Sequence, residues 1–168
     1  MSGGEPNRFG ALDCLNQVAE FHRTFRHPIV ESPGIPDPDR AALRIRLLQE
    51  ELSELQEAVE RGDITEAADA LCDLQYVLSG AVLEFGLAER FPALFDEVQR
   101  SNMSKACRTR AEAEETIHWY AENKGEEAHA EEHGGMFLVY RNRDKKTLKS
   151  IRYAPARLEP IVRGDAGE

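Results

Sequence analysis

The sequence predicts a mostly helical protein, a four- to five-helix antiparallel bundle with a small C-terminal β-hairpin. Three observations predict this class. Apolar residues recur at helical spacing through the first two thirds of the 168 residues, the joints between these segments are short, and two apolar runs around a polar turn follow near the C-terminus. With 41% of its residues apolar and 31% charged, the chain suits one domain with a single core.

Prolines, glycines and capping residues mark the ends of the expected helices. Pro28 ends the first helix, because the residue before a proline is driven out of the α region. Asp39 can cap the second helix, and Gly62 and Gly86 stand where the second and third helices end. Pro92 fits the first turn of the fourth helix. These four helices are expected at residues 12–26, 40–60, 64–85 and 88–104.

The chain changes character after Lys105. A periodic segment predicts a fifth helix, a polar stretch rich in His and Glu predicts a linker, and two apolar runs predict the hairpin. These segments are residues 111–121, 122–135 and 136–153. As domains we expect a disordered tail at residues 1–11, a helical bundle at 12–108 that carries the acidic residues described next, and an extension at 109–168 that packs on the bundle or on a partner subunit.

The composition excludes several classes of function. The formal net charge is -10, and there is no basic cluster, so we expect neither a nucleic-acid nor a membrane partner. The most apolar stretch, residues 71–87, contains Asp73, Gln75 and Glu84 and is no membrane span. The first residues lack the basic and apolar regions of a signal peptide. Three widely spaced cysteines indicate reduced thiols, so we expect a cytoplasmic protein.

Acidic residues on the second and third helices are the central functional signal. At about 100° per residue, each set falls on one narrow face of its helix. Because the joint between the two helices is short, they should be antiparallel neighbours whose acidic faces meet. The two sets are Glu50, Glu51 and Glu54, and Glu66, Asp69 and Asp73.

Such runs are usually solvated surface, but two features favour a cation site instead. The third helix is apolar nearly all round from residue 71 to residue 85, so we expect Asp73 to lie in the interior, where an unpaired carboxylate is costly. Lysines at the i+4 positions are also missing, and only Arg61 follows Glu57 at that spacing. All-carboxylate ligation suits Mg²⁺ or Mn²⁺, and bound Mg²⁺ usually completes its shell with waters and substrate phosphates.

Four stretches carry a resemblance to a known group of enzymes. They are Phe21-His22 with Pro28 and the Glu31-Ser-Pro motif, residues 46–54, residues 66–77 with Gly80, and residues 98–105, with a weaker match from Thr147 to Pro155. In order and spacing they resemble the all-α nucleoside triphosphate pyrophosphohydrolases, the MazG-like group with its dimeric dUTPase and phosphoribosyl-ATP pyrophosphohydrolase relatives. The resemblance implies a MazG-like helical bundle with catalytic function at residues 12–108.

The resemblance implies a Mg²⁺-dependent attack of water on the α-phosphorus of a nucleoside triphosphate, which releases pyrophosphate and a monophosphate. Glu51 and Glu54 match the first family motif. In the second motif we favour Asp73 as the Asp, with Ala70 at the family's Glu position and Asp69 replacing that Glu; the other alignment pairs Asp69 with Glu66. The implied metal ligands are Glu51, Glu54, Asp69 and Asp73, and the implied catalytic residues are Glu50, which orients or deprotonates the water, and Glu51.

The resemblance also implies a set of substrate-binding residues. Asn102 and Lys105 stand where the family contacts the nucleotide or its phosphates, and Lys149 could add a phosphate contact across a dimer interface. His22 and Tyr76, with Phe25, are candidates for the base pocket, although core packing explains an aromatic residue equally well. The expected substrate is dUTP or another non-standard or surplus deoxynucleotide, removed in nucleotide-pool house-cleaning, with phosphoribosyl-ATP less favoured.

The apolar circumference of the bundle predicts a homodimer, with a tetramer as the alternative. Two rival functions remain. The first is a non-catalytic helical scaffold whose acidic faces bind cations or a basic partner. The second is a zinc protease, because His129 to His133 matches the inverted His-x-x-Glu-His pattern; the absence of apolar periodicity around it favours an accidental surface cluster.

Overall fold

The computed structural model describes residues 9–164, which form a mostly helical protein with one small antiparallel sheet. Within this range every helix is too short or too polar to cross a lipid bilayer. The predicted N-terminal tail lies mostly outside the described residues. The helices are α1 (Cys14–Phe25), α2 (Pro38–Arg61), α3 (Ile64–Glu84), α4 (Phe91–Met103), α5 (Arg110–Lys124) and α6 (Glu159–Arg163), and the strands are β1 (Ala128–His133), β2 (Met136–Arg141) and β3 (Thr147–Leu148).

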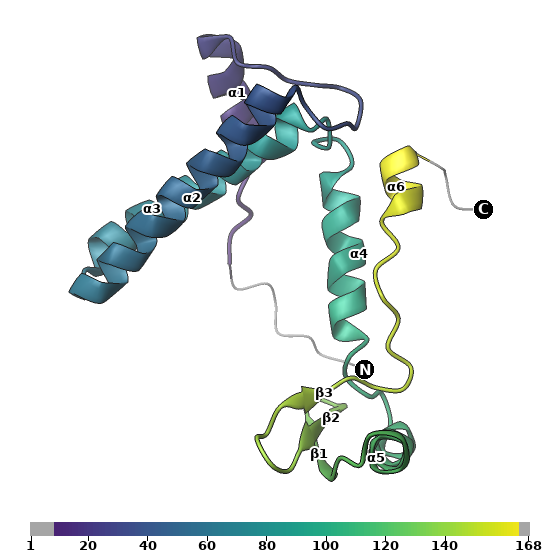
Figure 1. Ribbon diagram of the computed structural model, residues 1–168. Coiled ribbons are helices and arrows are strands. Elements are labelled where there is room, and N and C mark those ends of the chain that lie inside the picture. The colour runs from purple at the N-terminus through teal and green to yellow at the C-terminus, as the bar shows by residue number, and fades with distance from the viewer. Residues whose placement is uncertain (1–8, 165–168) are drawn as a thin grey trace. The chain divides into compact units, whose positions relative to one another are not determined.

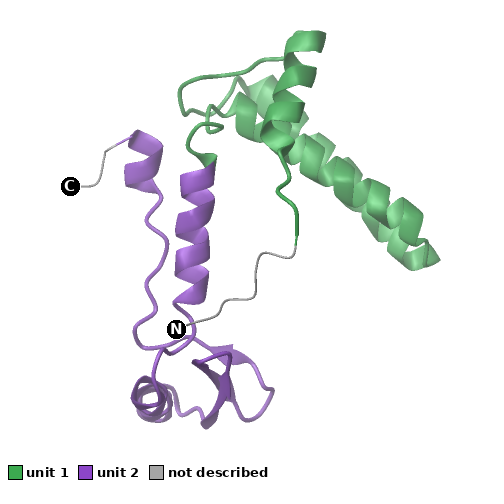
Figure 2. Cartoon of the chain, turned by 180° about the vertical axis from the view of Figure 1, so that it is seen from behind, with its two compact units in different colours: residues 1–91 green, residues 92–168 purple. Residues whose placement is uncertain are grey.

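The chain divides into two compact units, residues 1–91 and residues 92–168 (Figure 2). The first unit contains α1 to α3, and the second contains α4 to α6 with the sheet. The four- to five-helix bundle expected of one chain is therefore only partly present, because α4 groups with the C-terminal half. The compact units do not coincide with the expected boundary at residue 108, and the catalytic role of residues 12–108 stays a prediction.

A tight turn makes α2 and α3 antiparallel neighbours in the first unit, where they lie side by side (Figure 1). Gly62 ends α2 in the left-handed conformation, with φ of 66°, which glycine adopts without strain. Asp63 then caps α3, because its side chain accepts hydrogen bonds from the backbone N–H groups of Thr65 and Glu66. The sequence-predicted joint is confirmed.

The proline-rich connection between α1 and α2 binds along the end of α3. The N–H of Val30 donates to the carbonyl of Leu83, and the N–H of Gly34 donates to the carbonyl of Phe85. Gly86 has φ of 66°, and a Cβ there would stand 2.0 Å from the carbonyl oxygen of Ser32, so only glycine allows this approach. The connection is therefore an ordered part of the first unit.

The second unit contains a sheet in the order β1-β2-β3, with α5 packed on β1 and β2. The predicted pairing of β2 with β3 is confirmed, with Val139 opposite Leu148. The expectation of a polar linker at residues 122–135 is wrong, because α5 runs to Lys124 and β1 pairs with β2 around the Gly134-Gly135 turn. Sequence reasoning missed β1 because its side chains are polar on both faces, as an exposed edge strand allows.

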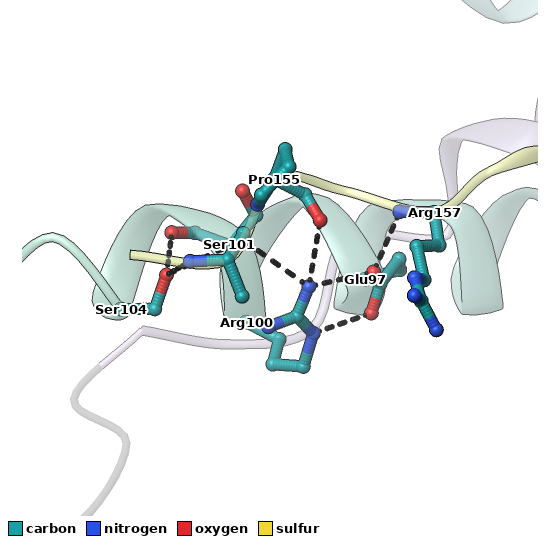
Figure 3. A network of polar contacts seen from close by, with 7 residues as sticks. Glu97, Arg100, Ser101, Ser104, Pro155 and Arg157 are labelled. Carbon is teal, nitrogen blue, oxygen red and sulfur yellow. Dashed lines mark hydrogen bonds and ion pairs between the residues drawn. The ribbon is translucent and has the colours of Figure 1, made fainter. Parts of the chain in front are cut away.

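The C-terminal segment is attached along α4 by a network of polar contacts (Figure 3). Arg100 donates to the carboxylate of Glu97 and to the carbonyl of Pro155 at 3.2 Å, and Glu97 also accepts from the backbone N–H of Arg157 at 2.8 Å. The hydroxyl of Ser104 accepts from the N–H of Ala154 at 3.1 Å. Glu97 is therefore a carboxylate whose charge is matched with hydrogen-bond donors.

Candidate active site

Five carboxylates gather on the adjoining faces of α2 and α3, and we name them the acidic cluster. Its members are Glu50, Glu51, Glu54, Asp69 and Asp73. Glu51 is half-buried, and its pKa is raised above the ordinary value, first by burial and then by the negative charges of the other four. The structure therefore brings together the acidic residues that the sequence placed on two separate helices.

Small residues allow the two helices to come close at the cluster. Ala58 on α2 and Ala67 and Ala70 on α3 are all buried, whereas Asp69 beside them is exposed. Ala70 occupies the family's Glu position in the favoured alignment, and its side chain is in the core. The charges that act most strongly on Glu51 include Asp69 and not Glu66. Asp69 therefore acts on Glu51 more strongly than Glu66 does, and which of the two completes the second motif stays a prediction.

The expectation that Asp73 lies in the interior is wrong for the single chain, since its side chain is exposed. Leu71 and Leu78 on the same helix are also exposed, at 55% and 41%, so this chain leaves part of the apolar surface of α3 uncovered. Apolar composition all round a helix predicts burial only if something covers every face. Four of the five carboxylates are consequently hydrated, and only Glu51 is partly withdrawn from water.

The chemistry of the acidic cluster fits a hard divalent cation. In residues 9–164 none of its five carboxylates has a Lys, Arg or His within salt-bridge distance, so their mutual repulsion is not offset by this chain. The donors are all oxygen, as Mg²⁺ requires. Among the described residues, no three His, Cys, Asp or Glu side chains are close enough together to hold a metal ion. Repulsion between like charges on exposed side chains is consistent with this separation.

A cavity of about 220 Å³ lies between α1, α2 and α3, and we name it the aromatic pocket. It is lined by Val18, Phe21, His22, His27, Arg40, Leu43, Arg44, Leu47, Tyr76 and Val77. Two predicted base-binding residues, His22 and Tyr76, therefore line one cavity. Phe25 does not line it and instead packs on Phe21, with ring centroids 4.4 Å apart.

The aromatic pocket and the acidic cluster are adjacent along the same helix pair. Leu47 of the pocket stands four residues before Glu51 on α2, and Val77 stands four residues after Asp73 on α3. Four residues advance a helix by about 6 Å. An apolar site for a ring and an acidic site for cations therefore lie within the length of one nucleotide.

A buried ionic network forms one wall of the pocket, and sequence reasoning missed it. Glu84 is 1% exposed and accepts hydrogen bonds from both Arg40 and Arg44. Burial alone would raise the pKa of Glu84, but the two arginines lower it below its ordinary value. One signal could have found the network, because Arg40 and Arg44 are spaced i, i+4 on α2 and Glu84 is a charged residue inside an apolar segment.

His22 is part of the same wall. Its Nδ1 donates to the carbonyl of Pro28 at 2.8 Å, so its Nε2 is left as an acceptor, 3.4 Å from Nη2 of Arg44. The pKa of His22 is lowered, chiefly because burial disfavours the charged imidazolium. His22 is therefore a neutral, oriented side chain at the pocket.

The second unit brings together the other three predicted substrate-binding residues around Tyr153. Nζ of Lys105 donates to Oδ1 of Asn102 at 2.8 Å, and Nζ of Lys149 lies 4.2 Å from the centroid of the Tyr153 ring. The pKa of Tyr153 is lowered, first by a hydrogen bond with Ser101 and then by the charges of Lys149 and Lys105. We name Asn102, Lys105 and Lys149 the lysine cluster.

The zinc-protease pattern does not form a metal site in the structure. His129 and His133 lie on strand β1, where positions four apart are about 13 Å from each other. His129 instead bonds Oδ1 of Asn142 at 2.7 Å and Glu131 at 3.2 Å, and these two hydrogen bonds raise its pKa. The accidental surface cluster is the better description.

Comparisons with known proteins identify a family over the segment that contains α2 and α3. A family model described as phosphoribosyl-ATP pyrophosphohydrolase matches residues 18–102, which include the acidic cluster and all residues that line the aromatic pocket. An uncharacterized protein, L479, of Acanthamoeba polyphaga mimivirus is 34% identical over 95 residues, which are 54% of this chain and 38% of that protein. The chain thus matches well under half of the length of this relative. By the match over half of its residues, the chain belongs to the phosphoribosyl-ATP pyrophosphohydrolase family, hydrolases of the MazG-like all-α superfamily.

Proposed function

We propose that this protein is a Mg²⁺-dependent pyrophosphohydrolase that converts a nucleoside triphosphate into its monophosphate and pyrophosphate. The observation that carries the proposal is the acidic cluster, five carboxylates without a basic partner in the described residues, one helical turn from a ring-sized pocket. Membership of a pyrophosphohydrolase family supports cleavage of the bond between the α- and β-phosphates.

The residues divide between holding the cation and handling the water. Glu51, Glu54, Asp69 and Asp73 would hold Mg²⁺, which when bound neutralises the phosphates and lowers the pKa of the attacking water. Glu50, on the exposed edge of the cluster, orients the water and accepts its proton. The ammonium groups of Lys105 and Lys149 bind phosphate oxygens as point charges.

The aromatic pocket binds the base of the substrate. A volume of about 220 Å³ is below the range of roughly 300–1,000 Å³ that is typical of sites for drug-sized ligands, and it suits a single planar group. We propose dUTP or another non-standard or surplus deoxynucleotide as substrate, consistent with a role in nucleotide-pool house-cleaning. Phosphoribosyl-ATP, the substrate in the description of the matching family, is the alternative.

The decisive experiment is a hydrolysis assay of the full chain on a panel of nucleoside triphosphates and phosphoribosyl-ATP, with Mg²⁺, with Mn²⁺ and with EDTA. We expect pyrophosphate, not inorganic phosphate, as the product, and no turnover with EDTA. Release of inorganic phosphate would show that a different bond is cleaved. If no nucleotide is turned over while cations still bind the acidic cluster, the scaffold function replaces the proposal.

We further propose a homodimer formed by an apolar stripe on α2 and α3. Six large side chains repeat every seven residues on the two helices and are 41% to 81% exposed. They are Ile45, Leu52 and Val59 on α2, and Ile64, Leu71 and Leu78 on α3. The seven-residue repeat is that of helices that pack together, and an exposed stripe of this length on two antiparallel helices is complementary to its own copy. Nine residues separate Ile45 from Glu54, about 180° around the helix, so the dimer leaves the acidic cluster free.

Light scattering of the double variant Leu52→Asp, Leu71→Asp tests this interface. We expect the natural chain to have the mass of a dimer, or of a tetramer built from dimers, and the variant to have the mass of one chain. Ile35→Asp is the matched control, because Ile35 is 81% exposed but lies outside the stripe. A natural chain that is monomeric at micromolar concentration would contradict the proposal.

A further inference from the structure

Arg44 is a buried cation whose hydrogen-bonding capacity is only partly used. Its side chain is 8% exposed, and its contacts with Glu84 and His22 both run through Nη2. Nε is completely buried and has no hydrogen-bond partner in the described residues. Nη1 takes up the space that a side chain on Gly80 would need, since a Cβ there would come within 2.8 Å of it, and none of the hydrogen bonds of Arg44 in the described residues uses Nη1. An unused donor in a buried position is costly unless a ligand supplies the acceptor.

The net charge of the ionic network around Glu84 also favours a ligand group that accepts hydrogen bonds. Arg40 and Arg44 share one carboxylate, Glu84, and His22 is neutral, so this wall of the aromatic pocket has one positive charge in excess. A group that accepts hydrogen bonds is stabilised beside this wall. A group that donates them would face N–H groups and would leave the unused N–H groups of Arg44 unpaired.

The aromatic part of the pocket lining suits a planar ring. Phe21 and His27 are stacked with centroids 5.8 Å apart and an interplanar angle of 17°, and Tyr76 meets Phe21 edge to face at 5.6 Å. All three side chains line the same cavity as Arg44. The pocket therefore offers aromatic faces for stacking and one edge made of hydrogen-bond donors.

We propose that Arg44 makes the pocket selective for keto bases, which present a carbonyl oxygen to its N–H groups, over the amino bases that carry an NH₂ group at the same ring position. The inference rests on the proposed function and adds the class of base to it. Uracil and hypoxanthine are accepted, and cytosine and adenine are rejected. The rejection has a physical cause, because an amino group cannot accept a hydrogen bond and leaves a buried donor unsatisfied.

The first test compares pairs of substrates whose bases differ in the keto or amino group at this position and in the proton on the adjacent ring nitrogen. With the natural full chain and Mg²⁺, we expect kcat/KM for dUTP to exceed that for dCTP about 30-fold or more, and dITP to exceed dATP in the same direction. Because the two members of each pair have the same size, pocket volume does not explain a preference. Equal kcat/KM values within both pairs would overturn the inference while leaving the proposed hydrolysis intact.

The second test assigns the preference to Arg44. Arg44→Lys keeps a positive charge beside Glu84 but removes the guanidinium donors, so the dUTP to dCTP ratio should fall to within about threefold. Arg46→Lys is the matched control, since Arg46 lies on the same helix, is exposed and does not line the pocket, and it should keep the ratio. A ratio unchanged in Arg44→Lys would overturn the role of Arg44.

Binding of nucleosides separates this inference from the proposed function. Deoxyuridine and deoxycytidine are titrated into the natural chain without metal and followed by NMR, a measurement that needs neither turnover nor a folded variant. Tighter binding of deoxyuridine supports the inference even if no triphosphate is hydrolysed, in which case only the proposed function fails. Equal affinity, or no binding of either nucleoside at millimolar concentration, would overturn it.

Discussion

Glutamates in the two units of the chain show opposite behaviour. In the second unit Glu97 accepts hydrogen bonds from Arg100 and from the backbone of Arg157, and these lower its pKa to about 2. In the first unit Glu51 has no cationic partner in the described residues, and burial and neighbouring carboxylates raise its pKa. A carboxylate supplied with an arginine holds segments of chain together. A carboxylate surrounded by its own kind is left with its charge available to a ligand.

The first unit also contains the structural kind of carboxylate, which makes the contrast sharper. Glu84 is buried and bonded to two arginines, yet it lies on the same helix as Asp69 and Asp73. One helix therefore carries both a paired acid in the core and unpaired acids at its surface. The partner, and not the residue type or the helix, decides what each carboxylate does.

The largest effect is expected from Glu51→Gln. Removing this charge should lower kcat/KM for pyrophosphate release by about 100-fold or more, while the melting temperature is unchanged or slightly higher because repulsion inside the acidic cluster is relieved. Glu57→Gln is the control, since Glu57 lies on the same helix but pairs with Arg61 outside the cluster. Near-natural turnover in Glu51→Gln would show that the residue roles proposed here are wrong.

Glu84→Gln should lower the stability of the folded chain, whereas Glu51→Gln should not. It leaves two arginines without their buried carboxylate, and we expect a loss of about 3 kcal/mol in the free energy of unfolding, measured with urea. Glu97→Gln, which breaks a more exposed ion pair, should cost clearly less. Equal losses in the free energy of unfolding for the two variants would contradict the expected difference between the buried ion pair and the more exposed one.

A smaller, kinetic effect is expected from the lysine cluster of the second unit. Lys105→Ala and Lys149→Ala should each raise KM about tenfold with kcat within about threefold of natural, as for a contact that binds ground state and transition state alike. Lys124→Ala is the control, because Lys124 stacks on Trp119 and is not predicted to touch substrate. An unchanged KM in both variants would remove these lysines from the substrate site.

The smallest effect concerns His22 and pH. Because its pKa in the folded chain is below the unfolded value near 6.5, the folded state binds the proton less readily; its stability is complete above about pH 6.5 and declines as the pH falls below that value. The melting temperature of the natural chain should therefore fall more steeply between pH 7 and pH 5 than that of His22→Asn. His118→Asn, at an exposed position, should follow the natural curve. A natural curve parallel to that of His22→Asn contradicts the burial of a neutral imidazole.

Much of the first unit could be predicted from the sequence because its features are local. The turn at Gly62 and Asp63 and the helices on either side follow from capping and spacing, and the meeting of the acidic faces follows from the short joint between the helices. The exposure of Asp73 could not be predicted in this way, since it depends on which surfaces of α3 another segment covers. Strand β1 was not predicted for a related reason. Its pairing with β2, and not its own polar composition, makes this segment a strand.

By itself the sequence determined approximately where α1, α2 and α3 begin and end, and that acidic residues of α2 and α3 share one side of a helix pair, because caps and a period of 3.6 residues act over a few positions of the chain. Only the tertiary structure decided that Arg40 and Arg44 meet Glu84, some 40 residues away, and that His22 and Tyr76 line one pocket beside them. Contacts between distant residues depend on how helices pack, and packing selects partners by shape and charge that spacing along a chain does not record.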